Sequence, residues 1–276
     1  MTVVDAAALL DRYDAFLLDA YGVLVDGGGP LPHAAAFVDA LERAGKQRLL
    51  LSNDASRTPA QVARRFDRFD IGLREDELLT SGMMIAPWVE AQGLRGKPAV
   101  VLGPRGSLTL ADEAGLVRVS PDDAHAEVFV VCDEAGYDFV PALEATLTTL
   151  VARIAAGQPC ALALPNPDVL YPKPGGTLGL TAGAAAAVIE RGLIARFGDD
   201  APQFTRLGKP HAPIFAAAVA RVEGRVLMIG DQLETDVAGA RAAGIDVALI
   251  ETGVGRRPPP DAPLQPTWVL ESLALT

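Results

Sequence analysis

Three charged residues stand where apolar runs end or where a helix is about to begin, which are places where side chains can converge on a ligand. Asp19 ends the run FLLD, Asp231 ends LMIGD, and Lys209 lies in RLGKP. Two carboxylates brought close together repel each other unless a cation lies between them. Oxygen ligands suit a hard divalent ion, and Mg²⁺ is the common choice. A lysine beside such an ion suits a phosphoryl group, because its charge neutralises phosphoryl oxygens.

Further polar residues extend this set. Ser52 and Asn53 follow the run RLLL and can donate hydrogen bonds to phosphoryl oxygens. Asp236 follows Asp231 in GDQLETD, near the start of the next expected helix, so it is placed to reach a metal ion or to hold Lys209. The structural alternatives are a turn at Asp19, a helix cap at Asp236 and a strand-end role for Asn53.

The elements that must position these residues alternate between strands and helices, which predicts a parallel sheet covered by helices. In an open parallel sheet, ligands bind beyond the carboxyl ends of the strands, near the point where the strand order reverses. If the strand before Asp19 lies between the strand before Ser52 and the strand before Asp231, the polar ends meet in one crevice. The expected strands span 15–20, 47–54, 97–106, 126–134, 159–168, 204–210, 225–231 and 246–253, and the expected helices span 33–45, 56–71, 83–93, 141–157, 184–194, 211–222 and 233–244.

Composition narrows the class of protein. The chain has 276 residues, enough for two domains of ordinary size, and half of them are hydrophobic, enough for a full core. The net charge of −11 disfavours general binding to nucleic acid or to an anionic membrane. The two cysteines form no CxxC motif, so we expect buried, reduced thiols. Without a signal peptide pattern or a long apolar stretch, we expect a cytoplasmic protein.

The motifs together resemble the haloacid dehalogenase (HAD) superfamily. DAYGVL at 19–24 resembles its first motif, LLSN at 50–53 its second, GKP at 208–210 its lysine motif and GDQLETD at 230–236 its fourth. PNPD at 165–168, together with the position of the inserted segment, resembles class IIA, the NagD-like and p-nitrophenyl phosphatase-like proteins. The resemblance covers essentially the whole chain.

This resemblance implies an α/β fold, with a Rossmann-like HAD core built on a parallel sheet and an inserted α/β cap domain of the class IIA type. We expect core residues at 1–82 and 183–276 and the cap at 83–182. The Pro- and Gly-rich passage at 171–183 is expected to be a connection. Relatives of this class often pair through their caps, which implies a homodimer.

The resemblance also implies roles for individual residues. Asp19 would attack the phosphorus of a small phosphomonoester, for example a sugar phosphate, and form an aspartyl-phosphate. Asp19, the main-chain carbonyl of Tyr21, and Asp231 would bind Mg²⁺, with Asp236 as a further candidate ligand. The residues that would contact the substrate are Ser52, Asn53 and Lys209 at the phosphate, and Asn166 and Asp168 in the cap, where the alternative is a turn at Pro167.

Tyr21 departs from the family pattern. Most phosphatases of the superfamily carry an aspartate at this position, which protonates the leaving oxygen and then activates water. A phenol can donate a proton but is rarely ionised at neutral pH, so Tyr21 predicts altered proton transfer. Two alternatives stay open: a metal-free hydrolase like the 2-haloacid dehalogenases, and a catalytically impaired protein that binds a phosphate ligand. The GDxxxTD carboxylates and the mixed strand and helix content of the insertion favour phosphoryl chemistry.

Overall fold

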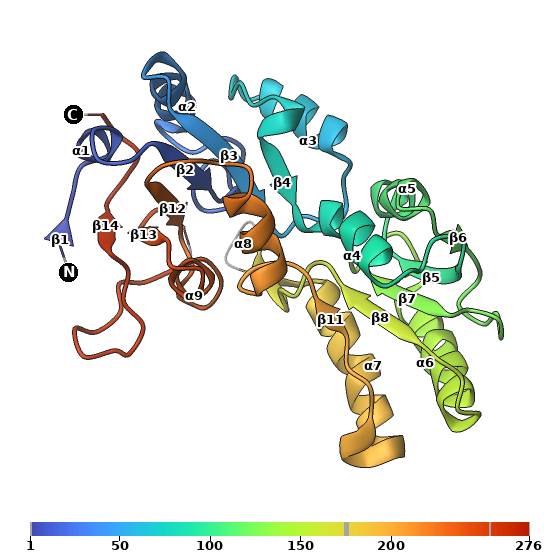
Figure 1. Ribbon diagram of the computed structural model, residues 1–276. Coiled ribbons are helices and arrows are strands. Elements are labelled where there is room, and N and C mark those ends of the chain that lie inside the picture. The colour runs from blue at the N-terminus through green and yellow to red at the C-terminus, as the bar shows by residue number, and fades with distance from the viewer. Residues whose placement is uncertain (1, 174–176, 254, 276) are drawn as a thin grey trace. The chain divides into compact units, whose positions relative to one another are not determined.

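The computed structural model describes residues 2–173, 177–253 and 255–275. Two compact units emerge, and each is described by itself. Unit 1 comprises Met1–Ser52, Pro59–Thr80 and Lys209–Thr276, and unit 2 comprises Asn53–Thr58 and Ser81–Gly208. The strands near the two chain ends, β1 and β14, pair with each other in unit 1 (Figure 1).

Unit 1 is built on a parallel sheet with the strand order β1-β14-β13-β12-β2-β3-β4 among the described residues. The strand before Asp19 therefore lies between the strand before Ser52 and the strand before Asp231, which is the condition under which their polar ends meet. Its strands are β1 (Thr2–Val3), β2 (Ala15–Leu18), β3 (Gln47–Ser52), β4 (Leu78–Thr80), β12 (Val226–Gly230), β13 (Asp246–Ile250) and β14 (Trp268–Leu270).

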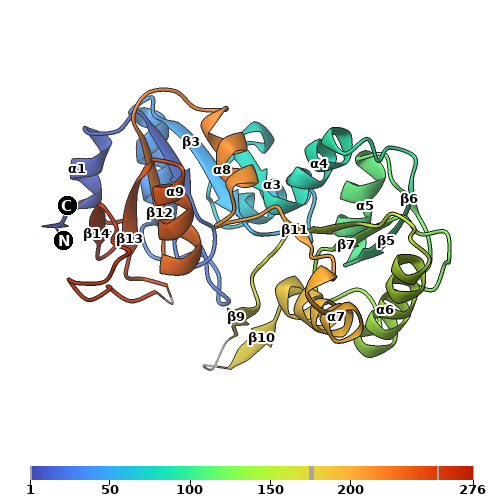
Figure 2. The same cartoon turned by 60° about the horizontal axis from the view of Figure 1, so that its bottom comes forward.

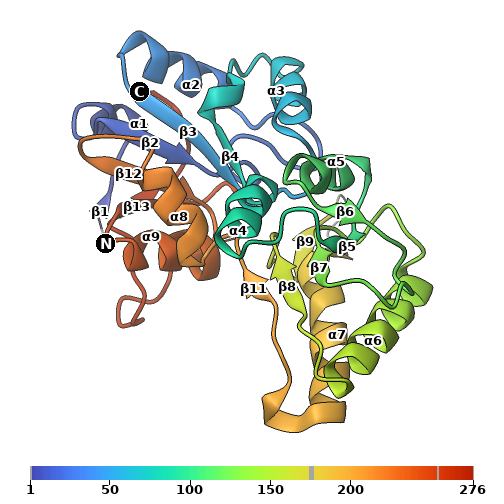
Figure 3. The same ribbon diagram turned by 45° about the vertical axis from the view of Figure 1, so that its right-hand side comes forward.

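Helices cover both faces of this sheet (Figure 3). Phe37 of α2 and Phe66 of α3 are buried in one hydrophobic cluster with Phe16 and Leu18 of β2. Helices α8 and α9 lie on the other face (Figure 3). The helical segments are α1 (Ala6–Leu10), α2 (Ala34–Arg43), α3 (Pro59–Asp67), the short η1 (Glu75–Glu77), α8 (Ala212–Val219), the π-helical turn η5 (Leu233–Val237) and α9 (Ala238–Ala242).

Unit 2 has its own parallel sheet, with the order β11-β8-β7-β5-β6 among the described residues. Helices α6 and α7 lie on one face of it (Figure 2), where leucines of both helices join a buried cluster with Phe129. The elements of unit 2 are η2 (Ser81–Met84), α4 (Ile85–Ala91), β5 (Pro98–Leu102), α5 (Arg105–Glu113), β6 (Val117–Arg118), β7 (Val128–Val131), α6 (Phe139–Ala155), β8 (Ala161–Leu164), β9 (Leu170–Pro172), β10 (Leu178–Leu180), α7 (Ala182–Phe197), η4 (Gly198–Asp200) and β11 (Thr205–Arg206).

The contacts place the second unit boundary later than the sequence prediction does. The predicted return to the core at residue 183 differs from the observed return at Lys209. The reason is that α7 packs on α6, and β11 extends the sheet of unit 2 by pairing in parallel with β8. The alternating strand and helix pattern continues through 183–208 without a break, so the sequence offers no signal for the change of sheet.

The structure also differs from the sequence predictions at the Pro- and Gly-rich passage and at one cysteine. Residues 174–176 of the passage expected to be a connection lie outside the described residues, and its flanks form an antiparallel pair, β9 with β10. Both cysteines are free, as predicted, but only Cys132 is buried, and Cys160 is half-buried. None of the helices in the described parts of the chain combines the length and the apolar character needed to span a membrane.

Candidate active site

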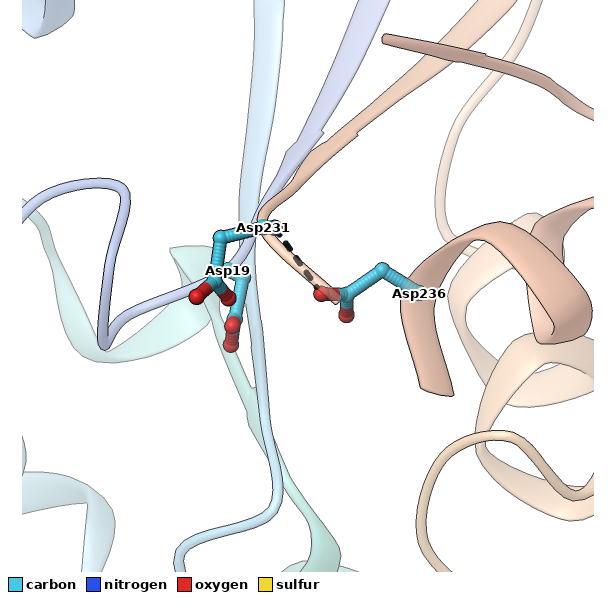
Figure 4. Close-up of side chains that lie close together, drawn as sticks. All are labelled: Asp19, Asp231 and Asp236. Atoms are coloured by element: carbon cyan, nitrogen blue, oxygen red, sulfur yellow. Dashed lines mark hydrogen bonds between the residues drawn. The ribbon is translucent and has the colours of Figure 1, made fainter. Parts of the chain in front are cut away.

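The site begins where two paired strands of unit 1 end. Strands β2 and β12 run in parallel with Leu18 opposite Ile229, and the main-chain N–H of Asp19 donates to the carbonyl of Ile229 at 2.9 Å. Asp19 follows β2 directly, and Asp231 follows β12. Because parallel strands present their carboxyl ends at the same edge, both carboxylates reach one place. Figure 4 shows these two side chains side by side.

Lys209 joins this pair from a distant part of the chain. Its Nζ lies 2.7 Å from Oδ1 of Asp19 and 2.6 Å from Oδ1 of Asp236. Lys209 is 2 % exposed and Asp236 is fully buried, so both ion pairs are shielded from water. Buried ion pairs need such close geometry, because each charge gives up its hydration.

The second carboxylate oxygen of Asp236 binds the main chain. Its Oδ2 accepts hydrogen bonds from the main-chain N–H groups of Asp231 and Gln232, each at 3.1 Å. The first of these bonds is the dashed line in Figure 4. The π-helical turn at Leu233–Val237 brings Asp236 back over the strand end that it caps. Asp236 therefore ties Lys209 to the loop that carries Asp231.

The charges of this cluster are out of balance. The cluster holds three buried carboxylates, two of which contact the ammonium group of Lys209. Among these four groups, the negative charges exceed the positive charge by two if all of them are ionised. Burial raises the pKa of Asp19 well above its ordinary value; Lys209 opposes this shift, and the charges of Asp236 and Asp231 add to it. Burial alone would lower the pKa of Lys209, but Asp19 and Asp236 together raise it. The cluster thus favours a bound cation.

The donor atoms fit a hard divalent cation. One carboxylate oxygen from each of Asp19, Asp231 and Asp236 lies within 4.8 Å of the other two, and all three residues are buried. Oxygen donors are the ligands that Mg²⁺ and Ca²⁺ prefer. A divalent charge would also balance the two surplus negative charges of the cluster.

A glycine makes room for the second carboxylate. Gly22 lies in the turn after Asp19 with φ +82°, a backbone conformation that side chains with a Cβ rarely adopt. A Cβ at this position would lie 2.4 Å from the carboxylate carbon of Asp231. Gly22 is therefore required both for the turn and for the approach of Asp231.

Tyr21 points its hydroxyl toward helix α3. Nη2 of Arg65 donates a hydrogen bond to the Tyr21 hydroxyl oxygen at 2.8 Å. The same guanidinium lies over the Tyr21 ring, 5.1 Å from its centroid. Tyr21 is 39 % exposed, in contrast to the buried carboxylates beside it in the sequence. Arg65 was not singled out in the sequence analysis, because an arginine on an amphipathic helix gives no local signal of such a partner.

The remaining predicted residues divide between the units. Ser52 is buried at the end of β3 in unit 1. Asn53, Asn166 and Asp168 belong to unit 2, where Nδ2 of Asn53 donates to Oδ1 of Asp168 at 2.9 Å. Oδ1 of Asn166 accepts from the main-chain N–H of Asp168 at 3.1 Å, which is the turn around Pro167 that the sequence analysis kept as an alternative. The substrate-binding roles of these three residues stay predictions.

The comparisons with known proteins show which family the chain matches. A family model described as haloacid dehalogenase-like hydrolase matches residues 16–117, and one described as HAD-hydrolase-like matches residues 206–276. An acid sugar phosphatase of Staphylococcus aureus is 28% identical over 249 residues, which are 89% of each chain.

Solved structures with the same fold include two phosphatases. The crystal structure of a possible sugar phosphatase of the HAD superfamily from Cytophaga hutchinsonii has a TM-score of 0.83 at 26% identity, covering 100% of this chain and 99% of that one. A glycerol phosphate phosphatase of Mycobacterium tuberculosis, crystallised in complex with magnesium, has a TM-score of 0.78 at 22% identity, covering 98% of this chain and 77% of that one. At this identity, the likeness to the glycerol phosphate phosphatase shows the fold alone.

The chain belongs to the haloacid dehalogenase-like hydrolases. Its neighbours place it in the NagD-like and p-nitrophenyl phosphatase-like branch, with a Rossmann-like core and an α/β cap domain. It is an enzyme of the phosphatase type within that family.

Proposed function

We propose that this protein is a magnesium-dependent phosphatase that hydrolyses small phosphomonoesters, sugar phosphates among them, through an aspartyl-phosphate on Asp19. The observation that carries the proposal is the buried cluster around Asp19. Asp19 contacts Lys209 at 2.7 Å, and its carboxylate lies close enough to those of Asp231 and Asp236 for the three to bind one metal ion. The sugar phosphatase name of the Staphylococcus aureus relative supports the substrate class.

In the first step, a carboxylate oxygen of Asp19 attacks the phosphorus, and the bond from phosphorus to the leaving oxygen breaks. Lys209 offsets negative charge on the phosphoryl oxygens, and Asp236 holds its ammonium group in place. Ser52, buried at the end of the neighbouring strand β3, offers a hydroxyl donor to the same oxygens. Water then attacks the aspartyl-phosphate, which releases inorganic phosphate and restores the Asp19 carboxylate.

The leaving oxygen needs a proton, and Tyr21 is the candidate donor. Arg65 orients the Tyr21 hydroxyl through the hydrogen bond at 2.8 Å. A phenol provides a proton less readily than a carboxylic acid does, so substrates with good leaving groups should react fastest.

Asp19, Asp231 and the main-chain carbonyl of Tyr21 would hold the magnesium ion, and Asp236 is close enough to contribute. When bound, the ion would neutralise the phosphoryl group and the surplus charge of the carboxylates. The magnesium complex of the glycerol phosphate phosphatase with the same fold supports the choice of metal.

The test is release of p-nitrophenol from p-nitrophenyl phosphate, with Mg²⁺ and after EDTA treatment. We expect turnover by the wild type only with Mg²⁺ and a loss on the order of 10³-fold or more in Asp19→Asn. Asp39→Asn, which changes an exposed aspartate of the same unit, is the matched control and should react like the wild type. Equal rates in wild type and Asp19→Asn would end the proposal.

Tyr21 also favours a second candidate, a protein that binds a phosphorylated ligand without hydrolysing it. Tight binding of a phosphomonoester with no product would select that candidate. Halide release from a haloacid in EDTA would instead select the metal-free dehalogenase. The homodimer and the cytoplasmic location stay predictions.

A further inference from the structure

Two proposed phosphate-binding residues stand immediately beside the points where the chain passes from one unit to the other. Ser52 is the last residue of unit 1 before Asn53, and Lys209 is the first residue after Gly208. The placement of Ser52 and Lys209 therefore depends on how Asn53 and Gly208 are held. Both of these residues contact one loop of unit 2, the segment 165–168 after β8.

The first contact is the hydrogen bond from Nδ2 of Asn53 to Oδ1 of Asp168 at 2.9 Å. Asn53 is 7 % exposed, so this bond to a carboxylate is largely shielded from water. Hydrogen bonds to a charged partner are about twice as strong as bonds between neutral groups.

The second contact is steric. A Cβ at Gly208 would lie 2.5 Å from Oδ1 of Asn53 and 2.5 Å from the carbonyl oxygen of Pro165. Gly208 thus allows the returning chain to pass against the Asn53 amide and the loop at once. The preceding residue is fixed too, since the N–H of Leu207 donates to the carbonyl of Leu164 at 3.0 Å.

The loop itself is anchored to a long helix. The carbonyl oxygen of Asp168 accepts hydrogen bonds from the hydroxyl of Thr181 and, at 2.9 Å, from the main-chain N–H of Gly183. Both donors lie at the start of α7, which packs on α6 and on the sheet of unit 2. The Asn53 amide is therefore tied to a rigid part of its unit.

We infer that Asn53 and Asp168 form a positioning pair, which fixes the chain beside Ser52 and beside Lys209, and that Asp168 acts through this pair and not by binding the substrate. This inference rests on the proposed function. It assigns the side chains that the sequence analysis expected at the substrate to the support of the phosphate-binding residues.

The test compares two substrates, p-nitrophenyl phosphate, which has no hydroxyl group, and glycerol phosphate, which has two. A positioning pair predicts that Asp168→Ala lowers kcat/KM by about tenfold on both, which corresponds to about 1.4 kcal/mol. The drop should lie mainly in kcat, and inhibition by inorganic phosphate should weaken as well. A loss on glycerol phosphate alone would identify Asp168 as a ligand for hydroxyl groups and overturn the inference.

Three further variants sharpen this result. Asp168→Asn keeps an acceptor oxygen for the Asn53 amide, so it should recover most of the activity on both substrates. The double variant Asn53→Ala with Asp168→Ala should be within about twofold of Asn53→Ala alone, since one bond is lost only once. Asp199→Ala removes an exposed aspartate of the same unit and is the matched control. Additive losses in the double variant would contradict the pair.

Two controls separate a wrong inference about Asn53 and Asp168 from a folding defect and from a wrong proposed function. Thermal unfolding of each variant identifies those that are folded at the assay temperature. If the wild type hydrolyses neither substrate with Mg²⁺, the proposed function fails. Hydrogen exchange then tests, without any activity, whether Asn53 and Asp168 fix the chain. Asp168→Ala should then speed amide exchange at 51–53 and 207–209 but not at 226–230, and equal exchange in wild type and variant would overturn the inference.

Discussion

The parallel sheets of the two units both carry polar residues at the carboxyl ends of their strands, but those residues are satisfied in different ways. In unit 1, three buried carboxylates lie close together and two of them contact the ammonium group of Lys209, so the charges of these four groups do not balance. In unit 2, polar groups of the loop after β8 pair with groups of the same unit: Asn166 accepts from the Asp168 main chain, and the Asp168 carboxylate accepts from Asn53.

This difference distinguishes polar residues that bind a ligand from polar residues that hold a loop in place. Polar groups that pair among themselves need nothing from outside, so they rigidify the loop that carries them. Buried charges of one sign that outnumber their partners call for an ion or a ligand. A polar residue at a strand end is therefore a weak indicator of a ligand site, and its neighbours in space decide which of the two it is.

The largest effect is expected from removing the ammonium group of Lys209. Lys209→Met should lower kcat/KM on p-nitrophenyl phosphate by about 10³-fold, because the phosphoryl charge loses its partner and Asp19 loses its contact at 2.7 Å. Steady-state kinetics at saturating Mg²⁺ provide the measurement. Lys46→Met, which changes a lysine between α2 and β3 that is not fully buried, serves as the control, and an equal loss in both variants would refute the assignment.

The next effect concerns proton donation. Replacing the phenol by a carboxylic acid in Tyr21→Asp should raise kcat by about 10²-fold on substrates with poor leaving groups. On p-nitrophenyl phosphate the gain should be smaller, because this leaving group needs less help. A comparison of kcat between p-nitrophenyl phosphate and glycerol phosphate checks this. If Tyr21→Asp left both rates unchanged, proton transfer by residue 21 would not limit turnover.

Metal binding should depend on pH because of Asp19. Burial raises the pKa of this carboxyl group, so in the metal-free protein it keeps its proton to a higher pH than an ordinary aspartate. Mg²⁺ must displace that proton, so its apparent affinity should rise by about tenfold per pH unit until Asp19 is ionised, and then level off. Calorimetric titrations across the acid to neutral range measure the slope. Asp39→Asn should retain it, and a wild-type affinity independent of pH would speak against the raised pKa.

The smallest effects are on stability, and they should have opposite signs in the two units. In EDTA at neutral pH, Asp19→Asn should raise the free energy of unfolding, because the raised pKa means that ionised Asp19 is disfavoured in the folded protein. This penalty is absent below the ordinary pKa of an aspartate and grows as the pH rises, so the gain should fade in acid.

Ser107→Ala in unit 2 should instead lower the free energy of unfolding by about 1 kcal/mol, since its buried hydroxyl donates to the carbonyl of Ala55 at 2.7 Å. Urea unfolding of both variants with EDTA at two pH values makes the comparison. Destabilisation by both variants at neutral pH would remove the contrast between the units.

Much of the arrangement in unit 1 could be predicted from the chain. The strands before Asp19, Ser52 and Asp231 are short apolar runs with polar residues after them, and this pattern is local. Their polar ends meet only if the strand before Asp19 lies between the other two, and the structure has that order.

The boundary of unit 2 and the role of its polar residues could not be predicted in the same way. Strand β11 has two residues, too few to show which sheet it joins. The PNPD segment is equally consistent with a substrate loop and with a turn, since both use the same residue types. Arg65 was missed because its contact with Tyr21 spans 44 residues.

The sequence by itself determined the class of fold, the family and the residue types at the strand ends, because periodicity, turn residues and motif spacing act over a few residues. Only the tertiary structure decided which of those residues meet. The pairing of Lys209 with Asp19 joins residues 190 positions apart, and that of Asn53 with Asp168 joins residues 115 apart. Such contacts depend on how sheets and helices pack, which no local pattern in the chain records.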